Sequence, residues 1–404
     1  MDSTCGFGTI IIPRMKKTLW IIALIAVVNA LGYGIIIPIL YSYSRKFGLT
    51  DFENGLLFSV FSVCQFIATP LIGRLSDAYG RRPLLLVSLL GTVGSFVLMA
   101  VAPNAFWLFV ARALDGITAG NIPVALAVIS DTTEPKDRAK GFGIIGASFG
   151  FGFTFGPAIS ALTIHWGTAV PFLIAGSIAF IAFLLTLVLL PETNTHKGIQ
   201  VTRHVFDFRH LFHALIDPAI GKTLLVSFLV MLGFSIFIYA FQPMSVELLH
   251  LSAREISVIF TAIGIVGLIS QGAVIPRVIR RFGERPVLVG SLISSVITFA
   301  LLYMTRSYPL FVTIVLVQAF ANGFSNPVIQ ALLSKEADAK SQGAIMGINA
   351  SYQSIGQIVG PVIGGLLATI FIPLPFLAAS ASMLVAAVLA VGMLHKHIRQ
   401  QSLV

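Results

Sequence analysis

Twelve long apolar segments restrict the fold of this chain more than any other feature of its sequence. A transmembrane helix needs about 20 apolar residues to cross the hydrocarbon core of a bilayer. Charged residues make up 10% of the 404 residues, whereas a soluble domain carries about 25%, so the main solvent must be lipid. We therefore expect an all-α integral membrane protein with twelve transmembrane helices. The predicted spans are 19–41, 55–73, 84–102, 107–129, 141–162, 170–190, 222–243, 256–275, 287–305, 309–333, 343–371 and 373–394.

The distribution of positive charge predicts how these spans are oriented. With the N-terminus inside, 21 of the 26 Lys and Arg residues fall in inner segments and only 4 in outer loops. Inner loops of membrane proteins carry this excess of Lys and Arg. We therefore predict that both termini are cytoplasmic and that the protein lies in a cell membrane, such as the bacterial cytoplasmic membrane. The same distribution explains the net charge of +10 without any nucleic-acid partner.

The two halves of the chain repeat each other's glycine and proline positions. Gly156 and Pro157 recur 204 residues later as Gly360 and Pro361. A duplicated six-helix unit is the usual build of a transporter whose halves rock about a midplane site. The predicted parts are an N-terminal extension (1–14), a six-helix bundle (15–190), a cytoplasmic linker (191–221), a second six-helix bundle (222–394) and a cytoplasmic tail (395–404). We expect the extension to be dispensable, because Met15 reads as a natural start before the first span.

A loop rich in glycine and arginine joins the second and third predicted spans. Its glycines, Gly73 and Gly80, permit a tight turn, and Asp77 can cap a helix N-terminus. The arginines of the loop are Arg74, Arg81 and Arg82. Such side chains can pair with carboxylates or with carbonyls at helix ends. We interpret the loop as an inner-side latch between the two halves; a positively charged loop that only sets topology is the alternative.

This loop resembles the signature loop of the major facilitator superfamily, G-x-L-x-D-x-x-G-R-R, and the resemblance extends over essentially the whole chain. It implies the major facilitator fold of two pseudo-symmetric six-helix bundles, and secondary active transport by alternating access in a monomer. The copy of the loop in the second half departs from the signature, because Arg280 stands where the acid would be. We therefore expect an asymmetric latch in which Asp77 is the acid that matters.

A row of glycines followed by a proline marks the fifth predicted span. Gly152 and Gly156 are four residues apart, a spacing that lets two helices approach closely, and Pro157 can bend the helix. Together with Gly146, these residues resemble the glycine–proline pattern that is associated with antiporters of the superfamily. The resemblance implies exchange, and ordinary close packing is the alternative interpretation.

Arg112 and Asp115 are the only charged residues that we find deep inside a predicted span. They are three residues apart, so they share one face of a helix. Charges at membrane depth are costly and usually functional. We predict that Asp115 takes up and releases a proton with Arg112 as its partner, so that the proton gradient is the energy source and no cofactor is needed. A permanently paired structural salt bridge is the alternative.

Uncharged polar side chains in predicted spans 1, 7 and 10 are candidate substrate contacts, since these spans line the cavity in the superfamily. They are Asn29, Tyr33, Tyr239, Gln242, Gln318, Asn322 and Asn326. Such a cavity suits an amphipathic organic solute, and interhelical hydrogen bonds are the alternative role for these residues. The fourth span resembles that of the tetracycline-efflux-like branch, whose exporters carry an acid where this chain has Asn29. We therefore expect a substrate other than tetracycline.

Signatures of other chemistry are missing from the sequence. There is no GxxxxGK[ST] phosphate loop and no HExxH zinc motif, and Cys5 and Cys64 lie outside any metal-binding cluster. We therefore expect neither an enzyme nor a metal site. The main hypothesis is a proton-coupled exporter of amphipathic drugs or metabolites. The alternatives are a metabolite or siderophore transporter of the same fold, for which inward transport is also open, and a receptor-like membrane protein without flux.

Overall fold

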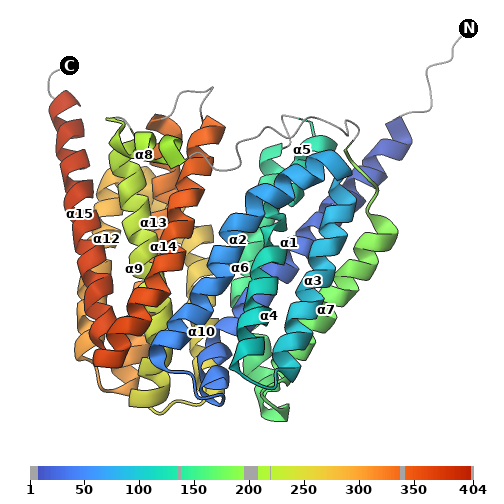
Figure 1. Ribbon diagram of the computed structural model, residues 1–404. Coiled ribbons are helices and arrows are strands. Elements are labelled where there is room, and N and C mark those ends of the chain that lie inside the picture. Colours follow the sequence, from blue (N-terminus) through green and yellow to red (C-terminus); the bar gives the residue numbers. More distant parts are fainter. Residues whose placement is uncertain (1–7, 135–137, 195–207, 219, 337–341, 402–404) are drawn as a thin grey trace, which may run out of the picture. The chain divides into compact units, whose positions relative to one another are not determined.

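The computed structural model describes residues 8–134, 138–194, 208–218, 220–336 and 342–401 (Figure 1). Within these ranges every regular element is a helix, and 12 of the helical segments are long and apolar enough to cross a membrane. Each of them overlaps one of the predicted spans and departs from it by up to several residues at either end. The predicted all-α fold class with twelve transmembrane helices is therefore confirmed.

The first of two compact units, unit 1, contains Met1–Ile39 and Val63–Val205. Its elements are α1 (Gly8–Arg45) as far as Ile39, α2 (Asp51–Tyr79) from Val63, α3 (Arg81–Val101), α4 (Ala105–Thr118), η1 (Ala119–Asn121), α5 (Ile122–Thr132), α6 (Arg138–Thr163), η2 (Ile164–Trp166) and α7 (Val170–Leu189). Helix α3 packs against α4 and α7. The core gathers branched and small side chains from α1, α3, α5 and α7, such as Ile22, Leu89, Val128 and Ala182.

Unit 2 contains Leu40–Ser62 and Phe206–Val404. Unit 2 thus includes the C-terminal end of α1, from Leu40, and the N-terminal part of α2, as far as Ser62. Its other elements are α8 (Phe208–Ile216), α9 (Gly221–Pro243), η3 (Met244–Leu248), α10 (Ala253–Ile269), η4 (Ser270–Val274), α11 (Ile275–Phe282), α12 (Glu284–Met304), α13 (Tyr308–Glu336), α14 (Gln342–Ile370) and α15 (Leu374–Gln401). Helix α9 packs against α14 and α15, and α15 also packs against α12. The segments η3 and η4 are π-helical turns that continue α9 and α10.

The structure differs from the predicted organisation at four places. The fourth span is not one helix, because a 3₁₀ turn, η1, separates α4 from α5, and Pro123 lies in the first turn of α5. The predicted linker contains the short helix α8, and α15 runs past the predicted end of the last span. The joined ends of α1 and α2 belong to unit 2. The bundle boundaries at 190 and 222 stay a prediction, and residues 195–207 of the linker lie outside the described residues.

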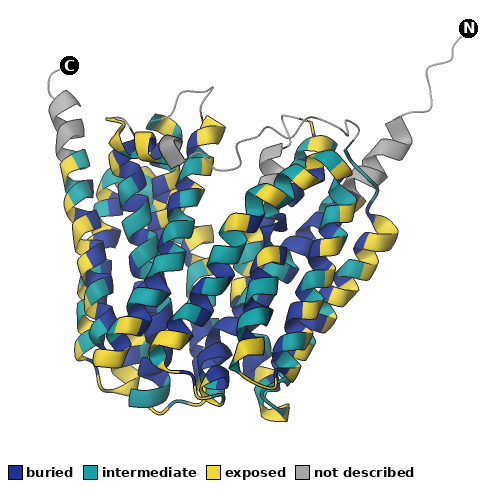
Figure 2. Cartoon of the chain, viewed as in Figure 1, coloured by how far each residue is buried: buried dark blue, intermediate teal, exposed yellow. Residues whose placement is uncertain are grey.

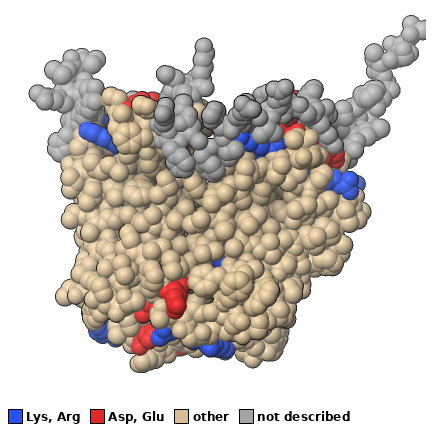
Figure 3. Space-filling view, in the orientation of Figure 1, with Lys and Arg blue, Asp and Glu red and all other residues tan. Residues whose placement is uncertain are grey.

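The surface has the composition expected for contact with hydrocarbon. Large apolar side chains are exposed along the outside of the helices: Val188 is 77% exposed and Met304 is 73% exposed. Figure 2 shows such exposed positions alternating with buried ones along α7 and α15. On the face drawn in Figure 3, most charged atoms lie near the helix ends and the middle of the helices is almost free of them. An exposed apolar band of this kind is stable only when lipid covers it.

Glycines permit the close crossing of two helices in each unit. In unit 1, α6 crosses α1 at Gly156, where an added Cβ would lie 2.8 Å from the Cα of Gly34. In unit 2, α14 crosses α9 at the repeated Gly360, where an added Cβ would lie 3.0 Å from the backbone nitrogen of Ile236. An added Cβ at Gly146, by contrast, would meet no atom within 4 Å. Close packing therefore accounts for Gly156 but not for Gly146.

We expect Gly156→Ala to lower the melting temperature of the purified protein, because the new methyl group would collide with the backbone of α1. Overpacking of this kind costs about 1–3 kcal/mol. Gly146→Ala is the matched control: it meets open space and replaces a helix-interior glycine, which favours the helix by about 0.5–1 kcal/mol. Thermal unfolding in detergent measures both. Equal melting temperatures for the two variants would show that α1 and α6 do not need this contact.

Candidate functional site

The loop between α2 and α3 is a single residue, Gly80, held in a conformation that other residues rarely adopt. Its φ angle is 111°, and the carboxylate of Glu192 occupies the space where a Cβ would lie. Glu192 accepts hydrogen bonds from the backbone N–H groups of Arg81, at 3.0 Å, and Arg82, at 3.3 Å. These two N–H groups lie in the first turn of α3, where a negatively charged side chain is favourable because it faces the positive end of the helix dipole. The cap that we expected from Asp77 is therefore supplied by Glu192, which follows α7.

Arg81 is the centre of an ion-pair network at this end of unit 1. Its guanidinium pairs with Asp77 in the last turn of α2, and its Nε lies 3.2 Å from Oδ2 of Asp131 on α5. It also donates to the Ser76 hydroxyl at 2.7 Å. Gly73 and Arg74 lie one turn earlier in α2. One arginine thus ties α2, α3 and α5 together, and the role of the loop as a latch stays a prediction.

The second half contains the same ion pair with its charges reversed. Arg81 corresponds to Glu284 and Asp131 corresponds to Lys335, at the repeat offsets of 203 and 204 residues. Lys335 Nζ lies 2.6 Å from Glu284 Oε1, so the Coulomb attraction is kept although both signs change. Our sequence comparison considered only Arg280, which replaces the acid of the signature. The change from Arg81 to Glu284 together with the change from Asp131 to Lys335 is the sequence signal that could have predicted this ion pair.

The membrane-depth pair forms as the sequence predicts, on one face of α4. Nη1 of Arg112 donates to Oδ2 of Asp115 at 2.8 Å, and the two side chains are 2% and 10% exposed. Ser95 of α3 and Tyr33 of α1 lie near this pair, and the Ser95 hydroxyl donates to the carbonyl of Thr92 at 2.8 Å. The pair therefore lies among side chains of α1, α3 and α4, away from bulk water.

A chain of neutral hydrogen bonds lies beside this pair, where α4 ends. Asn29 of α1 donates to Oδ1 of Asn121 at 2.7 Å, and Asn121 donates to the Ser88 hydroxyl at 2.7 Å. Ser88 in turn donates to the carbonyl of Thr118, the last residue of α4. Asn29, which we nominated as a substrate contact, is thus engaged in an interhelical hydrogen bond. Tyr33 packs its ring edge-to-face on Phe153, with centroids 5.5 Å apart.

The residues of unit 2 that we predicted to contact substrate lie in different environments. Tyr239 and Gln242 of α9 are buried, and Gln318 of α13 bonds to two hydroxyl groups of α12. Asn322 is half-buried, and Asn326 is exposed and accepts a hydrogen bond from α14 at 3.0 Å. The environments of Tyr239 and Gln318 fit the alternative role, interhelical bonding. Asn322 and Asn326 remain the more accessible candidates for substrate contact.

A polar cluster that the sequence analysis missed joins the ends of α1 and α2 to α9 within unit 2. We call it the Arg45 cluster; its members are Tyr41, Arg45, Asp51, Tyr239 and Glu247. Arg45 Nη2 lies 2.6 Å from Glu247 Oε1, and the Tyr41 hydroxyl donates to Asp51 Oδ1 and lies 3.1 Å from Glu247 Oε1. Tyr239 donates to the backbone carbonyl of Asp51. The contacts join residues about 200 positions apart, which local patterns cannot predict.

Both halves of the chain match the same family. Residues 22–223 and residues 223–402 each match the sequence model of the Major Facilitator Superfamily. The multidrug resistance protein 2 of Bacillus subtilis is 29% identical over 378 residues, which cover 92% of this chain and 94% of the relative. The class C tetracycline resistance protein of Escherichia coli is 30% identical over 345 residues (83% and 85%). The quinolone resistance protein NorA of Staphylococcus aureus is 29% identical over 364 residues (89% and 92%).

Solved structures share the fold. The crystal structure of the human organic anion transporter MFSD10 superposes with a TM-score of 0.70 at 23% identity, covering 93% of this chain and 99% of the other. The nucleoside transporter NupG superposes with a TM-score of 0.77 at 15% identity and the same two coverages. At these identities the likeness concerns the fold alone.

We expect Asp77→Asn to reduce transport while folding stays near normal. The Asp77 side chain is 52% exposed, and Arg81 keeps its contacts with Asp131 and Ser76, so the change leaves no buried charge without a partner. Transport and melting temperature are measured together in proteoliposomes and detergent. Arg280→Ala, at the corresponding position of the second half, is the control and should matter less. Unchanged transport in Asp77→Asn would leave the loop as a topology signal only.

Proposed function

The chain belongs to the major facilitator superfamily of membrane transporters, and from this premise we propose that it exports amphipathic drugs or metabolites in exchange for protons. Drug-type substrates are supported by its relatives, whose names refer to multidrug, tetracycline and quinolone resistance. Alternating access is the expected mechanism for two repeated six-helix units.

The buried Arg112–Asp115 pair is the observation that carries the proposal of proton coupling. Among the described residues, no other acid forms an ion pair in the middle of a span. Protonation of Asp115 would remove one of the two charges and leave Arg112 as a buried cation, which is unfavourable unless the site changes shape. A protonated and an ionised Asp115 therefore favour different arrangements around α4, which is the property that a coupling site needs.

The break in the fourth span supports movement at this position. The residues between Asp115 and Pro123 form the end of α4 and the 3₁₀ turn η1, and 3₁₀ stretches inside a helix often mark hinges. The neighbouring chain Asn29–Asn121–Ser88 contains only neutral donors and acceptors, which can exchange partners without moving charge. In our mechanism, proton uptake weakens the pair, α4 shifts relative to η1, and the substrate site becomes accessible from the other side.

In the proposed mechanism, contacts at the two ends of α2 form and break in turn. Asp51 in its first turn belongs to the Arg45 cluster, and Asp77 in its last turn pairs with Arg81. We expect the bonds of the Arg45 cluster, which lies within unit 2, and those of the Arg81 network, which lies within unit 1, to change during the transport cycle. An importer of metabolites would use the same contacts, so the direction of transport is decided by measurement of flux.

We expect Asp115→Asn to abolish uphill transport driven by a pH gradient, because the site can no longer change its charge. Substrate exchange at equal pH should persist, since exchange needs only the conformational cycle. The assay uses proteoliposomes and a ligand found by thermal-shift screening of amphipathic drugs, with substrate flux and proton flux followed in parallel. Full proton-driven activity in a well-folded Asp115→Asn protein would contradict the proposal, and binding without any flux in the unaltered protein would favour a receptor.

The structural-pair alternative predicts a different set of results. If the pair only holds the fold, Arg112→Leu and Asp115→Leu each lose about 3–5 kcal/mol, because each leaves a buried charge without its partner. The double replacement then recovers stability and keeps proton-driven transport. Under our proposal the double variant recovers stability but does not couple. Melting temperature and pH-driven flux of the two singles and the double therefore separate the two roles.

A further inference from the structure

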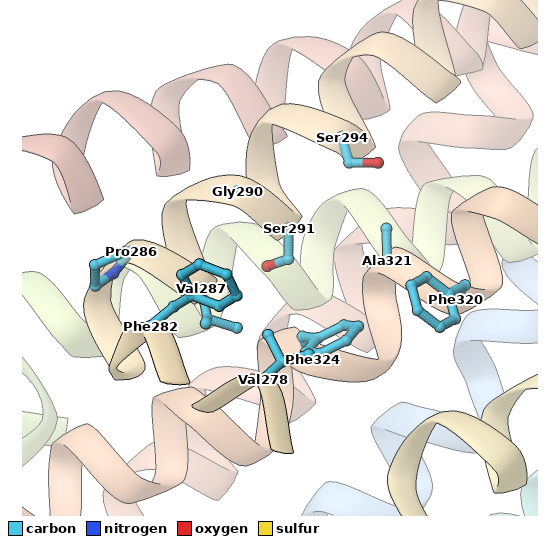
Figure 4. A pocket seen from close by; sticks show the side chains of 10 residues that line it. All are labelled: Val278, Phe282, Pro286, Val287, Gly290, Ser291, Ser294, Phe320, Ala321 and Phe324. Atoms are coloured by element: carbon cyan, nitrogen blue, oxygen red, sulfur yellow. The ribbon is translucent and has the colours of Figure 1, made fainter. Parts of the chain in front are cut away.

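An apolar groove opens on the surface of unit 2 between α11, α12 and α13. Its volume is about 370 Å³, and Val278, Phe282, Val287, Gly290, Phe320 and Phe324 line it. Figure 4 shows the three phenylalanine rings around the space, with Gly290 leaving its wall open. Phe282 is 59% exposed and Phe320 is 41% exposed, so the groove is open on its outer side. A groove of this composition within a membrane span is filled by hydrocarbon and not by water.

A second hollow of about 530 Å³, with four charged side chains in its lining, continues the groove at the end of the helices. The two share Phe282 and Pro286, and the second is lined by Glu284, Arg285 and Lys335. Arg285, which the positive-charge pattern predicts to be cytoplasmic, thus lies directly beyond an apolar space. An apolar groove that ends at cationic side chains has the complementary form of a phospholipid, with an acyl chain inside the span and a phosphate at its end.

The charges around the second hollow leave an excess of positive charge on α11. Glu284 pairs with Lys335, and Arg285 lies 3.8 Å from Glu336, so these four charges balance. Helix α11 adds three exposed arginines, which are Arg277, Arg280 and Arg281. Within the described residues none of the three forms an ion pair with an acid: Arg277 and Arg280 donate to carbonyls of the same helical segment, and the Arg281 guanidinium lies over the Phe282 ring at 5.5 Å.

The corresponding end of unit 1 has an acid, Asp77, at the position of Arg280. There Arg81 is paired with both Asp77 and Asp131. In unit 2 the position of Asp77 is taken by Arg280, which adds a positive charge where the first copy has a negative one. The departure from the signature loop therefore leaves α11 without the acid that pairs with an arginine in the first copy.

We propose that this part of unit 2 binds an anionic phospholipid, with one acyl chain in the groove and the phosphate bound by Arg281. Arg281 lies next to Phe282, whose side chain lines both the groove and the second hollow. An arginine binds a phosphate through two parallel hydrogen bonds. Arg277 lies one turn before Arg281 on the same side of the helix and adds to the attraction. Arg280 lies on the opposite side of α11 from Val278, at 200° by helical geometry of about 100° per residue.

The test compares lipid retention in five proteins by native mass spectrometry. Each protein is reconstituted in nanodiscs of phosphatidylcholine with phosphatidylglycerol and released into detergent. We expect the unaltered protein to retain phosphatidylglycerol in preference to phosphatidylcholine. Arg281→Gln should reduce retention of phosphatidylglycerol about fivefold, the effect of one cation near a lipid phosphate. Arg280→Gln removes the same charge from the other side of α11 and should change retention less than about twofold.

Gly290→Leu tests the acyl-chain part of the site. A Cβ at Gly290 meets no atom within 4 Å, so the new side chain enters the groove without disturbing the helices, and retention of phosphatidylglycerol should fall. Gly347→Leu, at an equally open position of α14, is its control and should retain the lipid. Equal losses in Arg281→Gln and Arg280→Gln would indicate unspecific surface attraction and overturn the proposal. Full retention in Gly290→Leu would also overturn it, as would displacement of the lipid by inorganic phosphate alone.

Discussion

Hydrocarbon offers a polar group neither a hydrogen-bond partner nor a counter-ion, so each polar side chain at membrane depth has to find its partner within the protein. Unit 1 provides partners for its buried polar side chains in two ways, both at the same depth in the membrane. Arg112 and Asp115 neutralise each other, and Asn29, Asn121 and Ser88 bond in series. Where α4 ends, Ser88 donates to the carbonyl of Thr118, which is how side chains make a helix break tolerable inside a membrane. The hinge and the charged pair therefore depend on the same hydrogen-bonded surroundings.

The repeated halves show which features of the inner network are constrained and which are free. An ion pair between the start of the third helix and the end of the fourth is kept in both halves, as Arg81–Asp131 and as Glu284–Lys335. The attraction between two such charges depends on the product of their signs and not on which partner is positive. The electric field around the pair does depend on which partner is positive, and so does the electrostatic environment of the nearby Arg280. Reversal thus preserves the local fold while it gives the two loops different electrostatic partners.

Hydropathy predicted all twelve spans because lipid solvation acts on every residue of a span, and the signal accumulates over about 20 positions. The pair of Arg112 and Asp115 was also predictable, since both charges lie on one turn of one helix. The cap of α3 by Glu192 was not, because its partners are 111 and 110 positions earlier in the chain and a carboxylate anywhere nearby could serve. Gln318 illustrates a further limit: helical periodicity gives the face of a residue, but only packing decides whether that face meets a cavity or the hydroxyls of α12.

Helix α1 links the chemistry of the two units because it belongs to both of them. Asn29 and Tyr33, in its unit 1 part, contact the surroundings of the charged pair, and Tyr41 and Arg45, in its unit 2 part, belong to the Arg45 cluster. The helix is continuous between these positions, and a continuous helix transmits a rotation or shift along its axis because each turn is hydrogen-bonded to the next. Under our proposal, a change of charge at Asp115 that alters the contacts of Tyr33 or Asn29 acts on the helix that also carries Arg45.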